Sequence, residues 1–391
     1  MTVRLYHRDS FARTFSATVV AHGRLGERPT MVLDRTGFYP EAGGQMADRG
    51  VVHAGGETRA VVDVQVDDGD LVHHVVDGEL PSVGADVDGT IDWPRRRVHM
   101  ALHTGQHLLS RALIEAAAAP TVSARLGERG CTIDVTRDAI PERELAAAEA
   151  LANAVIDDDV VVRAWFPEPG ELATLPLRRD PKVTDSVRVV AIGDFDVSPC
   201  GGTHCARSAQ IGSIRVLGVE RYKGMTRVTF AAGGRARALL ADHNEAITRL
   251  ARQLTCAPAD VPAAVDKLRG ALTDARAETT ATRERLAAAL AAALTTADGP
   301  GAVVTTVDDA ALLRPLAAAL HARGKDALLA ASTAAGTQVL LARADGSALD
   351  CGALLARLAA ATGGRGGGKP THAEGRLPAI ADWPAAVAAA R

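Results

Sequence analysis

Two short motifs, HTGQH at residues 103–107 and CGGTH at residues 200–204, each place two potential metal ligands four residues apart. The first is flanked by leucines at helical spacing, and on a helix the side chains at i and i+4 share one face. In the second, Gly201 and Gly202 permit the tight backbone that a ligand loop needs. Three imidazoles and one thiolate suit Zn²⁺ better than iron or copper. The predicted ligands of one zinc ion are His103, His107, Cys200 and His204. Any fold of this chain must therefore bring these two distant segments together.

The composition indicates an intracellular protein of more than one domain. The chain has 391 residues, 47% of them hydrophobic, and a net charge of -3, so any affinity for RNA must come from local basic patches. Its five cysteines are scattered, which argues against a disulfide framework. We see no signal-peptide pattern and no apolar run long enough to cross a membrane. We therefore expect a cytoplasmic protein without a membrane segment.

Changes in the apolar pattern predict an α+β multidomain chain of four parts. Residues 1–93 hold short β-branched runs between glycine and aspartate turns, which favours a small β-barrel-like domain. Residues 94–232 mix helix and strand patterns and contain all four ligands, which predicts an α+β zinc domain. Residues 233–298 carry a weak heptad pattern typical of a helical hairpin spacer, and two ordinary helices packed on a globular body remain the alternative. Residues 299–391 predict a small α/β domain with a glycine-rich loop, GGRGGGKP.

Four stretches carry a resemblance to a known family. HTGQHLLS and CGGTH resemble the paired zinc motifs of the alanyl-tRNA synthetase editing domain and of the free-standing AlaX trans-editing proteins. FYPEAGGQMADRG resembles the glycine-rich motif of the preceding β-domain, with Ala42 where a third glycine is common. GGRGGGKPTHAEG is similar, less closely, to the glycine-rich end of the synthetase C-terminal domain. Because no aminoacylation domain precedes residue 1, we expect a long AlaX protein rather than a synthetase.

The resemblance implies hydrolysis of the ester that joins serine, or glycine, to alanine tRNA. The four predicted ligands match the zinc positions of the family. A bound zinc ion could activate water, polarise the ester carbonyl or hold the substrate amino group, and the sequence does not choose among these. Thr121 and Ser123 lie where the family places residues that recognise the serine hydroxyl, although a hydroxyl in a strand or turn has the same pattern.

Mischarged alanine tRNA is the partner that this resemblance implies. The residues expected to contact the RNA are Gly43, Gly44, Gln45, Arg95, Arg96 and Arg97. The glycines would lay backbone N–H groups against the terminal adenosine, or simply form a tight turn, and the arginines would bind phosphate. A homodimer through the helical hairpin or the C-terminal domain is also expected. The alternative hypothesis is a non-catalytic tRNA-binding module with structural zinc, since four protein ligands are typical of closed sites.

Overall fold

The computed structural model describes residues 2–128, 130–181, 183, 186–295 and 301–391. The chain divides into two compact units, residues 1–247 and 248–391, and the division falls inside helix α4 (Gly234–Leu254). The predicted α+β class is confirmed, whereas the predicted domain boundaries near residues 93, 232 and 298 stay predictions. Within the described residues, no helix is both long and apolar enough to cross a membrane.

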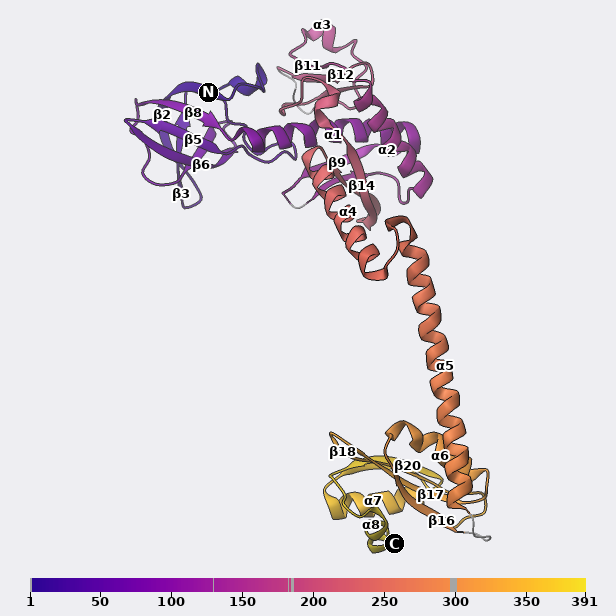
Figure 1. The fold of residues 1–391 in the computed structure, drawn as a ribbon. Coiled ribbons are helices and arrows are strands. Elements are labelled where there is room, and N and C mark those ends of the chain that lie inside the picture. The colour runs from indigo at the N-terminus through magenta and orange to yellow at the C-terminus, as the bar shows by residue number, and fades with distance from the viewer. Residues whose placement is uncertain (1, 129, 182, 184–185, 296–300) are drawn as a thin grey trace. The chain divides into compact units, whose positions relative to one another are not determined.

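The first unit begins with a closed barrel of six strands in the order β2-β3-β7-β6-β5-β8, as Figure 1 shows in part. Alternating side chains such as Val52 and Val64 point inward and are fully buried, which is the period-two pattern of a half-buried strand. The predicted small barrel is therefore confirmed. Its strands are β2 (Thr14–Leu25), β3 (Arg28–Leu33), β5 (Gly50–Ala54), β6 (Glu57–Val66), β7 (Val72–Val76) and β8 (Asp86–Ile91). The short strands β1 (Val3–Arg4) and β4 (Arg35–Thr36) pair in parallel beside it.

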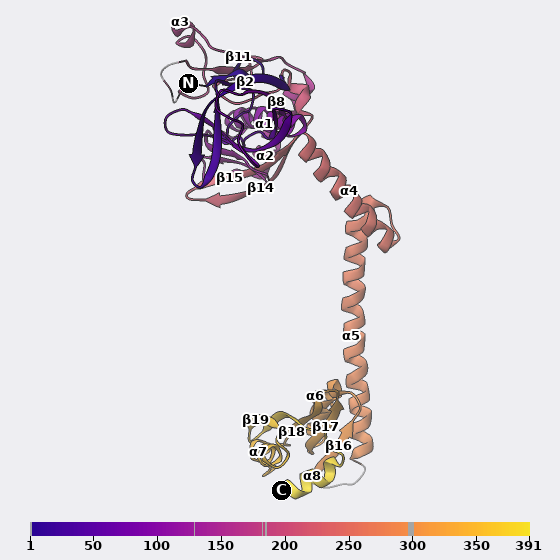
Figure 2. The same cartoon turned by 90° about the vertical axis from the view of Figure 1, so that its left-hand side faces the viewer.

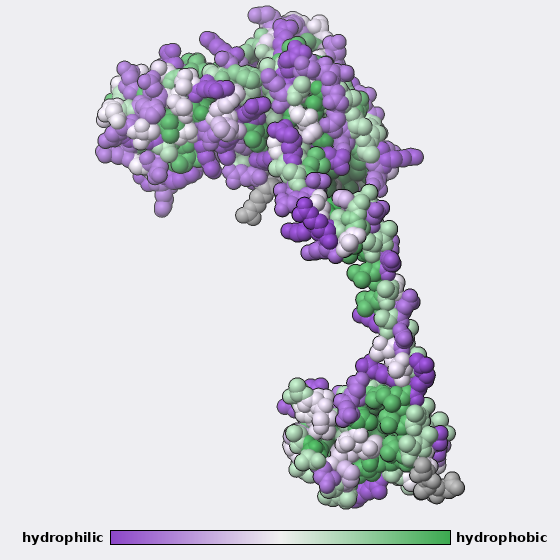
Figure 3. Space-filling view, in the orientation of Figure 1, coloured by the Kyte–Doolittle hydropathy of each residue, from purple (hydrophilic) through white to green (hydrophobic). Residues whose placement is uncertain are grey.

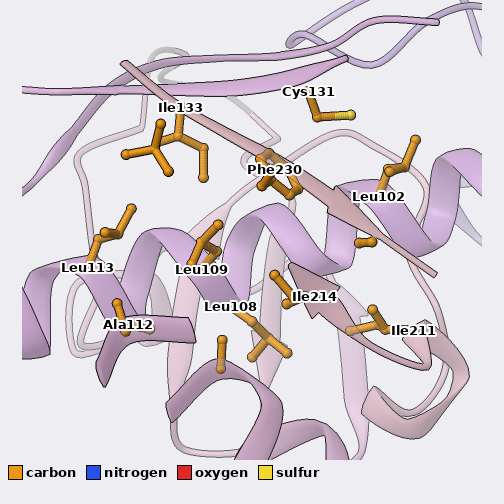
Figure 4. Close-up of a cluster of buried hydrophobic side chains, with 14 of the residues drawn as sticks. Leu102, Leu108, Leu109, Ala112, Leu113, Cys131, Ile133, Ile211, Ile214 and Phe230 are labelled. Atoms are coloured by element: carbon orange, nitrogen blue, oxygen red, sulfur yellow. The ribbon is translucent and has the colours of Figure 1, made fainter. Parts of the chain in front are cut away.

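Helix α1 (Trp93–Ala117) leaves the barrel and forms the centre of the following α+β region. It begins where the Asp92 side chain accepts a hydrogen bond from the Arg95 backbone N–H, with a proline in its first turn. Figure 4 shows leucines of this helix facing Ile133 and Phe230. Because α1 is buried along most of its length, the histidines that it carries lie inside the protein rather than on its surface.

Two antiparallel sheets and helix α2 (Glu142–Asp157) surround α1. The larger sheet has the order β14-β15-β10-β9, and the smaller sheet has the order β11-β12-β13. Their strands are β9 (Thr121–Leu126), β10 (Cys131–Val135), β11 (Val162–Trp165), β12 (Val189–Ile192), β13 (Asp196–Pro199), β14 (Ile214–Tyr222) and β15 (Met225–Ala232). A one-turn helix α3 (Pro169–Leu172) follows β11. Strand β13 ends one residue before Cys200, so the small sheet fixes the start of the second ligand motif.

The second unit contains helix α5 (Val261–Leu294) and a five-stranded sheet in the order β16-β17-β18-β20-β19 (Figure 2). Neighbouring residues on β17 serve opposite faces of this sheet: Leu329 packs with α5 and α6, and Leu328 packs with α7 and α8. The helices are α6 (Leu313–His321), α7 (Cys351–Thr362) and α8 (Trp383–Ala390). The strands are β16 (Ala302–Val307), β17 (Asp326–Thr333), β18 (Gly336–Ala342), β19 (Arg365–Lys369) and β20 (His372–Leu377).

The prediction of a glycine-rich loop before the last helix is wrong, because residues 365–369 form the edge strand β19. A side chain at Gly368 would place its Cβ 2.2 Å from the backbone oxygen of His372, and one at Gly366 would contact the backbone of Gly375 at 2.8 Å. The glycines therefore allow close backbone approach between paired strands. Residues 365–369 have the composition of a flexible linker, but they form a strand that pairs with β20.

The segment predicted as a hairpin spacer holds the two helices α4 and α5. Apolar side chains remain on the surface of α5, among them Leu268 and Leu272, which are 60% and 52% exposed, and Figure 3 shows apolar surface along this helix. The pairing of α4 with α5 and the homodimer through this segment stay predictions.

Candidate metal centre

Four side chains from α1 and from the loop after β13 converge on one point. The donor atoms of His103, His107, Cys200 and His204 all lie within 4.8 Å of one another. The Cys200 Sγ atom lies 3.5 Å from His103 Nε2 and 3.3 Å from His204 Nε2. Ligand bonds of about 2.0–2.3 Å around a tetrahedral zinc ion would separate a sulfur and a nitrogen ligand by about 3.5 Å. The donor set and its spacing therefore fit a tetrahedral metal ion.

A buried polar network orients His107. Its Nδ1 atom lies 3.1 Å from Asp196 Oδ2, and Arg178 Nε donates to Asp196 Oδ1 at 2.5 Å. The Ser198 hydroxyl also donates to this carboxylate, at 3.1 Å. Since Asp196 fixes the proton on Nδ1, the other nitrogen of His107 is free to face an ion. Asp196 is 1% exposed, so the network lies in the protein interior.

The other two histidines are held by uncharged groups. The Nδ1 atom of His103 lies 2.7 Å from Gln45 Oε1, and the Gln45 amide nitrogen donates to the Thr203 hydroxyl at 2.8 Å. The Nδ1 atom of His204 lies 3.2 Å from Thr104 Oγ1. Gln45 belongs to the loop after β4, so the N-terminal barrel region contributes directly to the centre. Each imidazole thus presents Nε2 to the same point through a different partner.

Burial and neighbouring groups shift the pKa values of the four side chains in different directions. Burial opposes the Cys200 thiolate, but the surrounding imidazoles of His103, His204 and His107 lower the pKa of this thiol well below its usual value. Burial lowers the pKa of His204 to about 3, which keeps its imidazole neutral. Burial also opposes the charged form of His107, but Cys200 and Asp196 raise its pKa. Metal binding requires a thiolate and neutral imidazoles, so Cys200 and His204 already favour the ligand form, whereas an ion would have to displace the proton that the raised pKa favours on His107.

The loop that carries Cys200 is shaped by one buried arginine and by the absence of a side chain. Arg188 Nη1 donates to the backbone oxygens of Cys200 at 3.0 Å and Gly202 at 2.8 Å. A Cβ atom at Gly202 would lie 2.1 Å from His103 Cε1, so only glycine fits there. At Gly201 the nearest atom would be His7 Nε2, at 3.7 Å. The two glycines of the motif therefore differ, since the second is required by the ligand and the first is not.

The centre borders the solvent at this loop. Cys200 is half-buried and Gly201 is exposed, whereas His103, His107 and His204 are buried. His7 lies against Gly201 and is half-buried, and burial together with the charges of Arg188 and Arg4 lowers its pKa to about 4. The backbone of this loop therefore reaches the surface at Gly201, while the donor atom of Cys200 is buried with those of the three histidines.

Thr121 and Ser123, the residues predicted to recognise a substrate hydroxyl, each form a hydrogen bond within the protein. Thr121 Oγ1 donates to Ser110 Oγ at 2.8 Å, and Ser123 Oγ donates to Asp134 Oδ2 at 2.8 Å. Thr121 connects through Ser110 to α1, one turn beyond His107. Recognition of a substrate hydroxyl by either residue stays a prediction.

Two of the residues expected to contact RNA are corrected. Arg96 is fully buried, forms an ion pair with Asp48 and donates to the Gly37 backbone oxygen at 2.7 Å, so its guanidinium is not available to a phosphate. Gln45 is also fully buried and its amide is engaged with His103 and Thr203. The predicted role of Gln45 is therefore replaced by a positioning role.

The remaining predicted RNA residues are on or near the surface. Arg97 is exposed, and Arg95 donates to the Ala47 backbone oxygen at 3.0 Å and to Glu128 at 3.1 Å. Gly43 has open space where a side chain would be, whereas a Cβ atom at Gly44 would lie 2.3 Å from the backbone oxygen of Ala124. RNA contact by these four residues stays a prediction.

Sequence reasoning missed Asp196, Arg178 and Arg188. The stretch GDFDVSPC offers two acids, and the period-two alternation of β13 would have assigned Asp194 and Asp196 to the same face. Asp194 is exposed and Asp196 is buried, because Asp194 lies in the turn before the strand. No pattern in the sequence distinguishes them.

Two segments of the chain match known protein families. Residues 12–95 match the family model described as tRNA synthetases class II (A), and residues 187–229 match the model of the threonyl and alanyl tRNA synthetase second additional domain. The first match covers the barrel, and the second covers the loop with Cys200 and His204. Two of the four candidate ligands, Cys200 and His204, thus lie in the second matched segment, whereas His103 and His107 lie between the two matches.

Individual relatives narrow this class. The chain is 34% identical over 392 residues to an alanine–tRNA ligase of Halorubrum lacusprofundi, which covers 96% of this chain and 42% of the relative. It is 35% identical over 242 residues to the alanyl-tRNA editing protein AlaX-L of Pyrococcus horikoshii, which covers 60% of this chain and 59% of the relative. The predicted resemblance is confirmed: the chain is related to the AlaX-type alanyl-tRNA editing proteins and to alanyl-tRNA synthetases. It spans less than two thirds of the length of either relative.

Proposed function

We propose that this protein hydrolyses the ester between a wrong amino acid, serine or glycine, and alanine tRNA, with one zinc ion held by the four converging ligands. The observation that carries the proposal is the convergence of three imidazoles and one thiolate from two motifs 97 residues apart, shown by the contact of Cys200 with His103. One relative that matches 60% of this chain is named as an alanyl-tRNA editing protein. A zinc ion bound there would supply Lewis-acid chemistry to the ester.

Other side chains would position the ligands and recognise the substrate. Asp196 and Gln45 hold the imidazoles of His107 and His103 in position through hydrogen bonds of 3.1 and 2.7 Å. Positioning of this kind matters because misplacement of a reacting group by about 1 Å can cost about a hundredfold in rate. Thr121 is the candidate to hydrogen-bond the hydroxyl of a serine substrate, a contact that alanine lacks.

Solvent access supports a catalytic centre over a closed structural one. A structural zinc site is usually sealed by its four ligands, whereas a catalytic site leaves an approach for substrate. Here the loop that carries Cys200 is exposed at Gly201, beside the buried ligand atoms. The ester of a tRNA 3′ end would approach the centre from this side.

The test is deacylation of seryl- and glycyl-tRNA(Ala) by the purified protein, with bound metal measured on the same sample. His103→Ala should abolish deacylation and lower the zinc content, with the far-UV circular dichroism unchanged. His243→Ala, on the exposed face of α4, is the matched histidine control and should behave as wild type. If the wild-type protein binds tRNA and zinc without any deacylation, the alternative holds, and the protein is a tRNA-binding module with structural zinc.

A further inference from the structure

An exposed aromatic ring lies beside the metal loop. The chain has six phenylalanines, three tyrosines and three tryptophans, and Phe166 is 46% exposed. It directly follows β11, whose last residue Trp165 pairs with Val189, which in turn pairs with Pro199. The next cross-strand row is therefore Phe166, Arg188 and Cys200, and the Cys200 N–H donates to the Arg188 backbone oxygen at 2.9 Å. Two strand spacings place Phe166 about 10 Å from the cysteine ligand.

A series of edge contacts holds this ring in place. Tyr39 and Tyr6 are buried and have ring centroids 5.2 Å apart at 76°. Tyr6 contacts His7 at 4.7 Å and 80°, and His7 contacts Phe166 at 5.8 Å and 61°. These are edge-to-face geometries that aromatic pairs prefer. The exposed Phe166 ring is thus the end of a supported series of rings that begins in the protein interior.

The same series is joined to the metal loop. Arg188 Nε donates to the His7 backbone oxygen at 3.3 Å, and the same guanidinium holds the backbone of Cys200 and Gly202. At the start of the loop, the exposed Arg179 donates to the Pro199 backbone oxygen at 3.2 Å. The exposed Gly201 backbone therefore lies near an aromatic ring, that of Phe166, and near the exposed guanidinium of Arg179.

We propose that Phe166, supported by His7, stacks on the terminal base of an RNA whose aminoacyl ester lies at the metal centre, and that Arg179 contacts the adjoining phosphate. The inference rests on the proposed function, because it takes the ester on the terminal ribose as the group held at the metal. An unpaired base is recognised by stacking on an aromatic side chain, and its phosphate by an arginine. The base is attached to the same ribose as the ester, so it must lie within one nucleotide of the metal loop.

The test compares kinetics and binding in matched variants. We would measure kcat and KM for deacylation of seryl-tRNA(Ala) by wild type, Phe166→Ala, Phe166→Trp and Phe11→Ala. Phe11 is the control, since it is 38% exposed and contacts the Trp93 ring at 5.8 Å. Phe166→Ala should raise KM roughly 5- to 150-fold, the effect of losing one stacked base, with little change in kcat. Phe166→Trp keeps an aromatic ring and should have a KM close to that of wild type. Phe11→Ala should also leave KM at the wild-type value.

Binding of uncharged tRNA, with and without its terminal adenosine, separates the two proposals. Removing the adenosine should weaken binding to wild type and have little further effect on Phe166→Ala. A wild-type protein that deacylates while Phe166→Ala keeps both its KM and its sensitivity to the adenosine contradicts the stacking inference alone. A wild-type protein without deacylase activity contradicts the proposed function, and the adenosine comparison then still decides whether Phe166 binds the terminal base. Equal losses in Phe166→Ala and Phe11→Ala would also refute stacking, because they would reflect general destabilisation.

Discussion

Asp196→Asn is the sharpest test of how the protein would hold a metal ion at the candidate centre. The substitution keeps the size of the side chain and removes the charge that accepts from His107 at 3.1 Å and from Arg178 at 2.5 Å. We expect metal affinity to fall about 10- to 100-fold, the usual cost of losing a carboxylate behind a ligating histidine, which is about 1.4–2.7 kcal/mol. The imidazole would keep its place on α1 but lose the partner that fixes its proton.

The same change should also lower stability through a separate route. Arg178 has a side chain 5% exposed and would lose its only ion-pair partner among the described residues. An unpaired buried charge costs about 3–5 kcal/mol. In the double variant Arg178→Met with Asp196→Asn the unpaired charge is gone, so most of the stability should return while the metal affinity stays low. The two effects of Asp196 are therefore separable.

The assay is competition for zinc against a chromogenic chelator, with urea unfolding of the same samples in the metal-free form. If Asp196→Asn binds zinc as tightly as wild type, the carboxylate does not position His107. If the double variant recovers zinc affinity together with stability, the loss in the single variant came from the unpaired arginine, and the reasoning from the histidine contact is refuted.

Three further predictions test the ligand loop, the barrel and the buried ion pair of Arg96 with Asp48. Gly202→Ala should lower zinc affinity at least about tenfold, because its methyl group would overlap His103, whereas Gly201→Ala should stay near wild type in the same competition assay; equal behaviour of the two would contradict the geometry. Burial lowers the pKa of His74 to about 4, below the unfolded value of about 6.5, so the unfolded chain binds more protons between these values and stability falls on acidification. His74→Gln should therefore lose about 2 kcal/mol less stability than wild type between pH 7 and pH 5 in urea unfolding, and parallel pH profiles would rule this out. Arg96→Met should cost about 3–5 kcal/mol in the same unfolding assay by leaving a buried carboxylate unpaired, and a cost below 1 kcal/mol would show that the pair is not needed.

Local spacing allowed part of the site to be predicted from the sequence. A helix places residues i and i+4 on one face whatever surrounds it, so His103 and His107 had to point the same way. The glycines of CGGTH indicated a tight loop, and the structure assigns the close approach to Gly202. Alternating β-branched runs indicated the barrel for the same local reason.

Contacts between distant segments decided the rest. Arg95, Arg96 and Arg97 are equivalent in the sequence, but the helix turns only Arg96 toward Asp48 of the barrel region and buries it. The glycines of residues 365–369 have the composition of a linker and form a strand because β20 is available to pair with them. Neighbouring residues of the same type have the same local propensity. Whether each of them is buried depends on which distant segment packs against it.

The sequence by itself determined which four side chains form the candidate metal site, because chelation at i and i+4 is a property of the local backbone and of ligand chemistry. Only the tertiary structure decided which side chains hydrogen-bond to those ligands. Asp196 from β13 contacts His107, and Gln45 from the barrel region contacts His103. These partners come from segments 89 and 58 residues away from the histidines that they hold. Their identity depends on how the elements pack, which no local pattern encodes.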